Sequence, residues 1–134
     1  EIGIGIDIKT YEWGTFYSDI KKGDFQLYSL SWIGVVDPDI YYNIFHSEMM
    51  PPNGSNRNRY KNSEIDRLVE DGQRATQQEK RKRIYSRIQR IAAEELPYIS
   101  LWYPMNIVAM GKGVKGFALY PDGNLISFKD MYKE

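Results

Sequence analysis

Four residues with acid–base or metal-binding side chains lie close together in the sequence: Asp37, Asp39, His46 and Glu48. Carboxylates and an imidazole can act as a general acid and base or bind a metal ion. Their spacing matches no metal-ligand motif, and no nucleophile-elbow pattern accompanies the histidine, which is the only one in the chain. Asp37 is better interpreted as a helix N-cap, because Pro38 follows it at the first helical position. A small hydrolase that uses His46 and a nearby carboxylate remains a rival interpretation.

An aromatic side chain precedes these residues at the end of an apolar run. Trp32 lies beside Gly34, where a predicted strand gives way to a loop and then to a helix N-terminus. Ligands of α/β proteins bind at the carboxyl ends of strands, where a flat ring, exposed backbone and a helix dipole can hold a polar organic molecule. Position alone therefore makes Trp32 a candidate ligand contact. The other tryptophans, Trp13 and Trp102, are better interpreted as packing residues.

A run of basic residues, "EKRKRIYSRIQR", raises the question of nucleic-acid binding. The run fits an amphipathic helix, whose basic face is exposed to water and whose apolar stripe is formed by Ile84, Ile88, Ile91 and Ala92. No aromatic residues alternate with the charges to stack on bases, and the whole chain has a formal net charge of +0. Nucleic acid is therefore not an expected partner.

The composition indicates one globular domain over residues 1–134. Hydrophobic residues make up 42% of the 134-residue chain, which is enough for a core. There is no cysteine, so neither disulfides nor zinc–thiolate sites are expected. No apolar run is long enough to span a membrane, and no signal peptide is visible. Because the chain opens on Glu1 in strand-like alternation, we expect it to be a partial domain from a longer protein.

Hydrophobic periodicity predicts strands alternating with helices, in the order β-α-β-α-α-α-β-β. A T-x-x-E capping box at Thr76–Glu79 is predicted to start the longest helix, and Ser63 to cap the preceding one. The long loop over 46–62 is expected to have a function or to pack against another part of the protein. The predicted strands cover 2–8, 25–33, 98–103 and 107–110, with 117–120 as a further candidate in an irregular tail, and the predicted helices cover 13–22, 38–45, 63–75 and 77–95.

Four motifs follow one another in a recognisable order. A tryptophan precedes DPD in "SWIGVVDPD", tyrosine and asparagine precede the helix "EIDRLV", an arginine-rich helix follows, and "ELPYISLWY" closes the set. This ordered set resembles the C-terminal portion of the family 5 extracellular solute-binding proteins, the receptors of ABC importers for peptides, nickel chelates and similar solutes. The resemblance extends from the first predicted strand to "VKGFALYPDGN".

The resemblance implies a two-lobed, periplasmic-binding-protein-like fold that closes around its ligand in a cleft between the lobes. This chain would be part of the C-terminal lobe, an α/β unit with a mixed sheet flanked by helices. The implied protein is not an enzyme and needs no cofactor or metal. It would capture a peptide-like or other small polar solute and deliver it to the membrane subunits of an ABC permease. The implied location is periplasmic or extracellular. A lipid anchor on the full-length protein is compatible with this location.

The resemblance also suggests a substrate-binding set of Trp32, Gly34, Val35 and Asp37. It places Trp32 on the cleft wall and Asp37 in the family's DP element, while the backbone of Gly34 and Val35 would offer polar groups. In peptide-binding members, an aspartate three residues beyond the tryptophan pairs with the α-ammonium group of the peptide. That position is Val35 here, and valine cannot neutralise a buried ammonium group. A peptide with a free N-terminus is therefore a doubtful solute, unless Asp37 moves inward to replace the missing charge.

A third interpretation needs no second lobe. The chain would then be a self-contained interaction module whose exposed face binds a protein partner. A parent reading frame of about the length of this chain would favour the module over the receptor.

Overall fold

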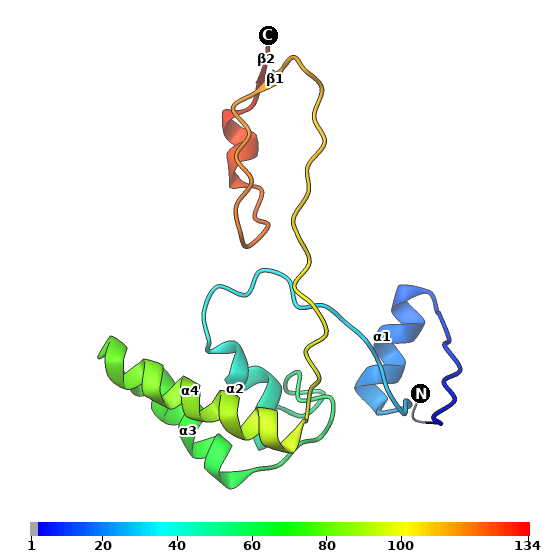
Figure 1. Cartoon of the computed structure of the whole chain (residues 1–134), viewed down its shortest axis with the longest axis vertical. Coiled ribbons are helices and arrows are strands. Elements are labelled where there is room, and N and C mark those ends of the chain that lie inside the picture. Colours follow the sequence, from blue (N-terminus) through cyan, green and yellow to red (C-terminus); the bar gives the residue numbers. More distant parts are fainter. Residues whose placement is uncertain (1–2) are drawn as a thin grey trace.

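The apolar core lies among three helices in a computed structural model that describes residues 3–134 (Figure 1). These helices are α2 (Ile40–Phe45), α3 (Ser63–Arg74) and α4 (Gln78–Glu95). Helix α3 packs against both α2 and α4. The buried side chains that they share are Ile44, Phe45, Ile65, Val69, Tyr85, Ile88 and Ile91.

Helix α3 forms because its apolar residues recur at helical spacing and its first turn is capped. Ile65 and Val69 are buried one turn apart, as the periodicity predicts. The cap is Asn62, whose side-chain oxygen accepts hydrogen bonds from the backbone N–H groups of Glu64 and Ile65, at 2.9 and 3.2 Å. The prediction that Ser63 caps this helix is therefore wrong by one residue.

Helix α4 begins at the predicted place without the predicted capping box. Its N-cap residue is Gln77, and no side chain of the Thr76–Glu79 motif makes a capping hydrogen bond. The helix ends as expected before Pro97, through Leu96 at a positive φ of 51°. Its buried face includes Ile88 and Ile91 from the predicted stripe.

Helix α1 (Trp13–Lys22) confirms the predicted helix over 13–22 and stands beside the core rather than within it (Figure 1). The carboxylate of Glu12 caps its N-terminus by accepting from Gly14 N at 2.8 Å. Gly23 ends it at φ 90°, a left-handed conformation that glycine adopts without steric cost.

The predicted strands are not formed among the described residues, and neither is a mixed sheet flanked by helices. The residues at 3–8, 25–33, 98–103, 107–110 and 117–120 make no ladder, while Ile2 lies outside the described residues. The sheet that is described has two strands, β1 (Val114–Lys115) and β2 (Tyr132–Lys133), paired antiparallel. A 3-10 helix, η2 (Ile126–Asp130), lies between them in sequence. A strand requires a neighbour for its backbone hydrogen bonds, and these segments have none.

The unpaired segments expose their apolar side chains. The alternating Ile4, Ile6 and Ile8 are exposed, and so are many apolar residues of the long extended segment between α4 and β1 (Figure 1). Exposed apolar surface on this scale is typical of sites that contact another protein, a membrane or a ligand. The alternation is present in the sequence, but no partner strand pairs with these segments among residues 3–134.

The loop after α2 confirms the prediction of irregular backbone over 46–62, apart from a short 3-10 helix, η1 (Ser47–Met49). Asn56 holds it together from a fully buried position. Its amide nitrogen donates to the carbonyl oxygens of His46 and Tyr60 at 3.1 and 2.7 Å, and its oxygen accepts from Tyr60 N at 3.0 Å. The loop therefore packs against its own chain.

Candidate functional site

A shallow pocket of about 330 Å³ lies between the extended segment that ends at Val36 and the start of α2. The structure brings all four predicted substrate-binding residues to this pocket. Trp32 is 39% exposed there, and Gly34 turns the chain at φ 73°. The complete lining is Trp32, Ile33, Gly34, Val35, Val36, Asp37, Asp39 and Ile40.

Asp37 is not the N-cap that the sequence predicts, because α2 begins two residues later than expected, at Ile40. The Oδ1 of Asp37 accepts from the backbone N–H of Asp39 at 2.8 Å, in the turn that leads into the helix. The N-cap residue by backbone geometry is Asp39, which makes no side-chain capping bond. The Asp-Pro motif thus fixes the direction in which the chain enters α2.

A guanidinium group on α4 neutralises Asp37. Arg81 donates from Nη1 to Asp37 Oδ2 at 3.0 Å and from Nη2 to Oδ1 at 2.6 Å, a bidentate pair. Its Nη2 also reaches Asp39 Oδ1 at 2.8 Å. The hydrogen bonds from Arg81 and then from Asp39 N hold the pKa of Asp37 below its ordinary value. Asp37 is therefore an ionised, already paired carboxylate rather than an available general acid.

Tyr85 completes this polar cluster from the buried side. Its hydroxyl donates to Asp39 Oδ1, and its ring lies 4.9 Å from the guanidinium carbon of Arg81. Burial, followed by the hydrogen bond to Asp39, raises the pKa of Tyr85. Sequence reasoning missed both residues, since Arg81 belongs to a run interpreted as a solvated face and Tyr85 lies beside the predicted apolar stripe. Helical spacing from Ile88 to Tyr85 was the available signal for the tyrosine.

Arg57 was also missed, and it lies over Trp32. Its guanidinium carbon is 5.0 Å from the centre of the Trp32 ring and 5.4 Å from the centre of the Tyr17 ring. The arginine is 5% exposed, so the contact is largely removed from water. Nothing in the sequence pattern relates these positions, which belong to three separate segments.

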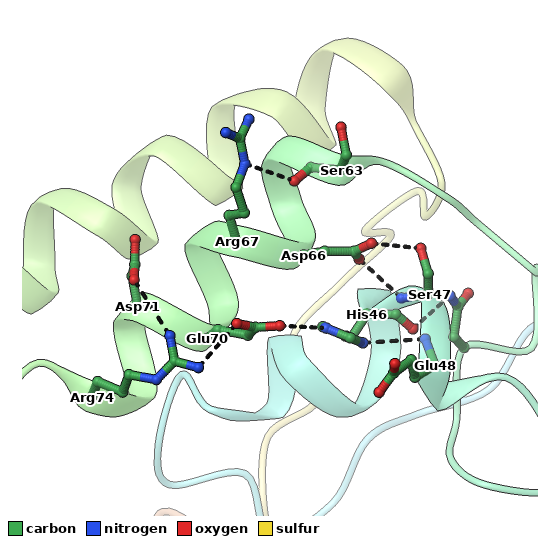
Figure 2. A network of polar contacts seen from close by, with 10 residues as sticks. His46, Ser47, Glu48, Ser63, Asp66, Arg67, Glu70, Asp71 and Arg74 are labelled. Atoms are coloured by element: carbon green, nitrogen blue, oxygen red, sulfur yellow. Dashed lines mark hydrogen bonds and ion pairs between the residues drawn. The ribbon is translucent and has the colours of Figure 1, made fainter.

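His46 occupies a structural network instead of a catalytic one (Figure 2). Its Nδ1 accepts from the backbone N–H of Glu48 at 3.1 Å, so Nε2 carries the proton and donates to Glu70 Oε1 at 3.3 Å. The neighbouring Ser47 hydroxyl donates to Asp66 rather than to the imidazole. The histidine is 4% exposed. Both ring nitrogens thus have partners within the fold.

No group of three potential metal-ligating side chains is found in the described part of the chain. The carboxylates of Asp37 and Asp39 face Arg81, and His46 pairs with Glu70 on a different helix. The structure therefore separates the four residues that the sequence places close together into two unrelated clusters.

Comparison with curated proteins identifies relatives along nearly the whole chain. The oligopeptide-binding protein AppA of Bacillus subtilis is 32% identical over 133 residues, which are 96% of this chain and 24% of AppA. The di/tripeptide-binding protein 1 of Pseudomonas aeruginosa is 31% identical over 132 residues, 98% of this chain and 24% of that protein. The resemblance to solute-binding proteins is confirmed.

A further relative is named as a probable D,D-dipeptide-binding periplasmic protein, DdpA of Escherichia coli, at 29% identity over 90% of this chain and 24% of DdpA. The chain thus spans about a quarter of the length of the solute-binding proteins that it matches. No protein-family model matches the chain, and no solved structure matches it significantly. Among the described helices, none combines the length and the apolar character that crossing a membrane requires.

Proposed function

We propose that this chain contributes one wall of the ligand cleft in the substrate-binding component of an ABC import system. The solute would be peptide-like or another small polar molecule, captured in the periplasm or outside the cell and delivered to the membrane permease. The observation that carries the proposal is the pocket at Trp32, which lies in a chain similar over nearly its whole length to peptide-binding proteins. The relatives are named as binding proteins, which fits a non-enzymatic role.

The chain would belong to the C-terminal lobe, and the remainder of the protein would supply the opposing wall. The half-exposed Trp32 ring would pack on the solute, and the backbone at Gly34 and Val35 would offer hydrogen-bonding groups. Closure of the second lobe would exclude water from these contacts. The exposed apolar segments support this assignment, because extended chains with alternating apolar residues are suited to join a larger sheet.

Charge at the pocket bears on the class of solute. Val35 offers no carboxylate, and the two carboxylates that line the pocket, Asp37 and Asp39, are both bonded to Arg81 on α4. An ammonium group placed against Val35 would therefore lose its hydration without gaining a counter-charge. A solute without a free α-ammonium group at this wall, such as an N-blocked peptide, fits the pocket better than a free-N-terminal one.

The test is calorimetric titration of the full-length protein with an N-acetylated dipeptide and with the same dipeptide carrying a free amine. We expect Trp32→Ala to weaken solute binding by about tenfold or more, since a fully packed aromatic contact contributes well over 1 kcal/mol. Trp102→Ala, which removes a tryptophan outside the pocket, is the matched control.

Two results would contradict the proposal. Micromolar binding by the isolated 134-residue chain would show that no second wall is needed. Tight binding of the free-amine dipeptide that Asp37→Ala leaves unchanged would refute the charge argument. Turnover of generic ester or peptide substrates that disappears in His46→Ala would instead support the hydrolase.

A further inference from the structure

Three side chains from separate segments meet beside the pocket: Tyr17 from α1, Trp32 from the extended segment, and Arg57 from the loop after α2. The guanidinium group of Arg57 lies over both rings, at 5.0 Å from the Trp32 centre and 5.4 Å from the Tyr17 centre. Both distances are within the range of cation–π attraction. The arrangement links α1 and the Trp32 segment to the loop.

The Arg57 side chain is nearly removed from water, at 5% exposed. Its Nη2 donates to Ser55 Oγ at 3.4 Å, and no carboxylate among the described residues forms an ion pair with it. A buried cation is stabilised here chiefly by aromatic faces. The planar guanidinium suits this position, because it stacks on rings in a way that an ammonium group does not.

We propose that Arg57 is the positioning residue of the Trp32 wall, and that its charge makes this wall favour a neutral or anionic solute group over a cationic one. This inference rests on the proposed function and deepens it by naming the class of solute group that packs against Trp32. The position of Trp32 is set by Arg57 from one face, and the remaining exposed surface of the ring is what a solute can reach.

The electrostatic part follows from the ring itself. The negative face of an aromatic ring attracts one cation, and a second cation that approaches the same ring meets both a weaker attraction and direct repulsion from the first. The guanidinium group of Arg57 already lies over the face of the Trp32 ring. Val35 adds no carboxylate to this wall, and the two carboxylates of the pocket, Asp37 and Asp39, are already bonded to Arg81.

The experiment measures fluorescence of Trp32 alone, in a chain carrying Trp13→Phe and Trp102→Phe. Quenching by neutral acrylamide reports the accessibility of the ring. The ratio of quenching by iodide to quenching by caesium, measured at equal ionic strength, reports the local charge. We expect Arg57→Met to raise the acrylamide quenching constant about two-fold or more, as loss of one cation–π contact predicts. The ratio of iodide to caesium quenching should fall in the same variant.

Arg57→Lys separates the two roles, because it keeps the charge and removes the planar stacking. It should raise acrylamide quenching while preserving the iodide-to-caesium ratio. Arg83→Met, which removes an exposed arginine from α4, is the matched control and should change neither quantity. Far-UV circular dichroism verifies that the helices of each variant are intact.

Unchanged quenching of Trp32 in Arg57→Met, with its helices intact, would overturn the positioning role. An unchanged iodide-to-caesium ratio in that variant would overturn the charge preference. If Arg57→Met loses its helices, the Arg57→Lys variant tests the positioning role in its place. An acrylamide quenching constant for Arg57→Lys equal to that of the parent chain would refute the stacking role. None of these measurements uses a solute, so a failure to bind dipeptides would count against the proposed function without affecting this result.

Discussion

Arg81 and Asp37 are 44 residues apart in the chain and form a bidentate ion pair, in which Nη1 donates to Oδ2 and Nη2 donates to Oδ1. The pair fastens the turn before α2 to the first half of α4 and borders the pocket at Trp32. Arg81 Nε also donates to Gly72 O at 3.4 Å, which adds the end of α3 to the same junction. Arg81 on α4 thus connects the turn before α2 and the end of α3 beside the candidate site.

This pair predicts a pH-dependent stability. Because the folded state holds the pKa of Asp37 below its ordinary value, the stabilisation is fully present above about pH 5 and is lost as the pH falls through the lowered folded value. In urea unfolding monitored by circular dichroism, Asp37→Asn should lower the midpoint near neutral pH, and the difference from the parent chain should shrink steadily in acid.

The contrary outcome is a difference that stays constant with pH, which would mean that the asparagine disturbs the turn rather than the charge. Asp7→Asn serves as the control, since this carboxylate is highly exposed and its nearest lysine nitrogen is 4.0 Å away. Its effect should be small at every pH.

The core among the three helices predicts a large loss of stability on truncation. Ile88 has no exposed surface, so Ile88→Ala should lower the free energy of unfolding by about 2–5 kcal/mol through lost burial and a residual cavity. Ile99→Ala changes an isoleucine that is 68% exposed and should cost no more than about 0.5 kcal/mol. Equal effects of the two substitutions in thermal or urea unfolding would show that the helices do not share this core.

The hydrogen bonds of Asn56 predict that this one side-chain amide determines the conformation of the loop after α2. Asn56→Asp replaces the donor facing the carbonyl oxygens of His46 and Tyr60 by a carboxylate oxygen, which should lower the free energy of unfolding by about 1–3 kcal/mol or more. Asn53→Asp makes the same chemical change at an exposed amide, whose bond to Glu48 O measures 3.4 Å. That control should remain close to the parent, and comparable losses would argue against a specific role for Asn56.

At Gly72 in α3, substitution by alanine is expected to lower stability although alanine has the higher helix propensity. Alanine is usually favoured over glycine inside a helix by about 1 kcal/mol, but a Cβ at Gly72 would lie 2.8 Å from the Tyr85 ring and hydroxyl. Gly72→Ala should therefore destabilise the chain, because overpacking against a buried ring costs about 1–3 kcal/mol. In α1, Gly14→Ala faces only the flexible end of the Glu12 side chain and should be neutral or stabilising. A higher melting temperature for Gly72→Ala would show that Tyr85 moves aside readily.

The raised pKa of Tyr60 predicts that the folded chain loses stability at high pH. Burial, followed by the hydrogen bond to Glu95, raises the pKa of Tyr60 to about 12. A raised folded pKa means that the stabilisation is complete below about pH 10 and is lost as the pH rises towards the folded value. Tyr60→Phe should reduce this alkaline loss in urea unfolding, and an unchanged alkaline profile would contradict the assignment.

The helices were the predictable part of this fold, because the information that specifies a helix is local. Residues one turn apart, such as Ile65 and Val69, show the buried face directly, and Gly23 and Pro97 mark the ends of two helices. The errors at Ser63 and Thr76 concern single capping hydrogen bonds, for which neighbouring residues compete on nearly equal terms. All four candidate residues at the Trp32 pocket lie within one short stretch, and their role in substrate binding stays a prediction.

The sequence by itself determined two things: the helical periodicity, and the similarity that relates this chain to solute-binding proteins. Only the tertiary structure decided that Arg81 pairs with Asp37, that Arg57 lies over Trp32, and that His46 joins Glu70 in a structural network. These contacts connect residues distant in sequence, so no local pattern encodes them. The strands failed for the same physical reason: alternation shows that a segment can join a sheet, but a strand exists only when a neighbouring chain supplies its hydrogen bonds.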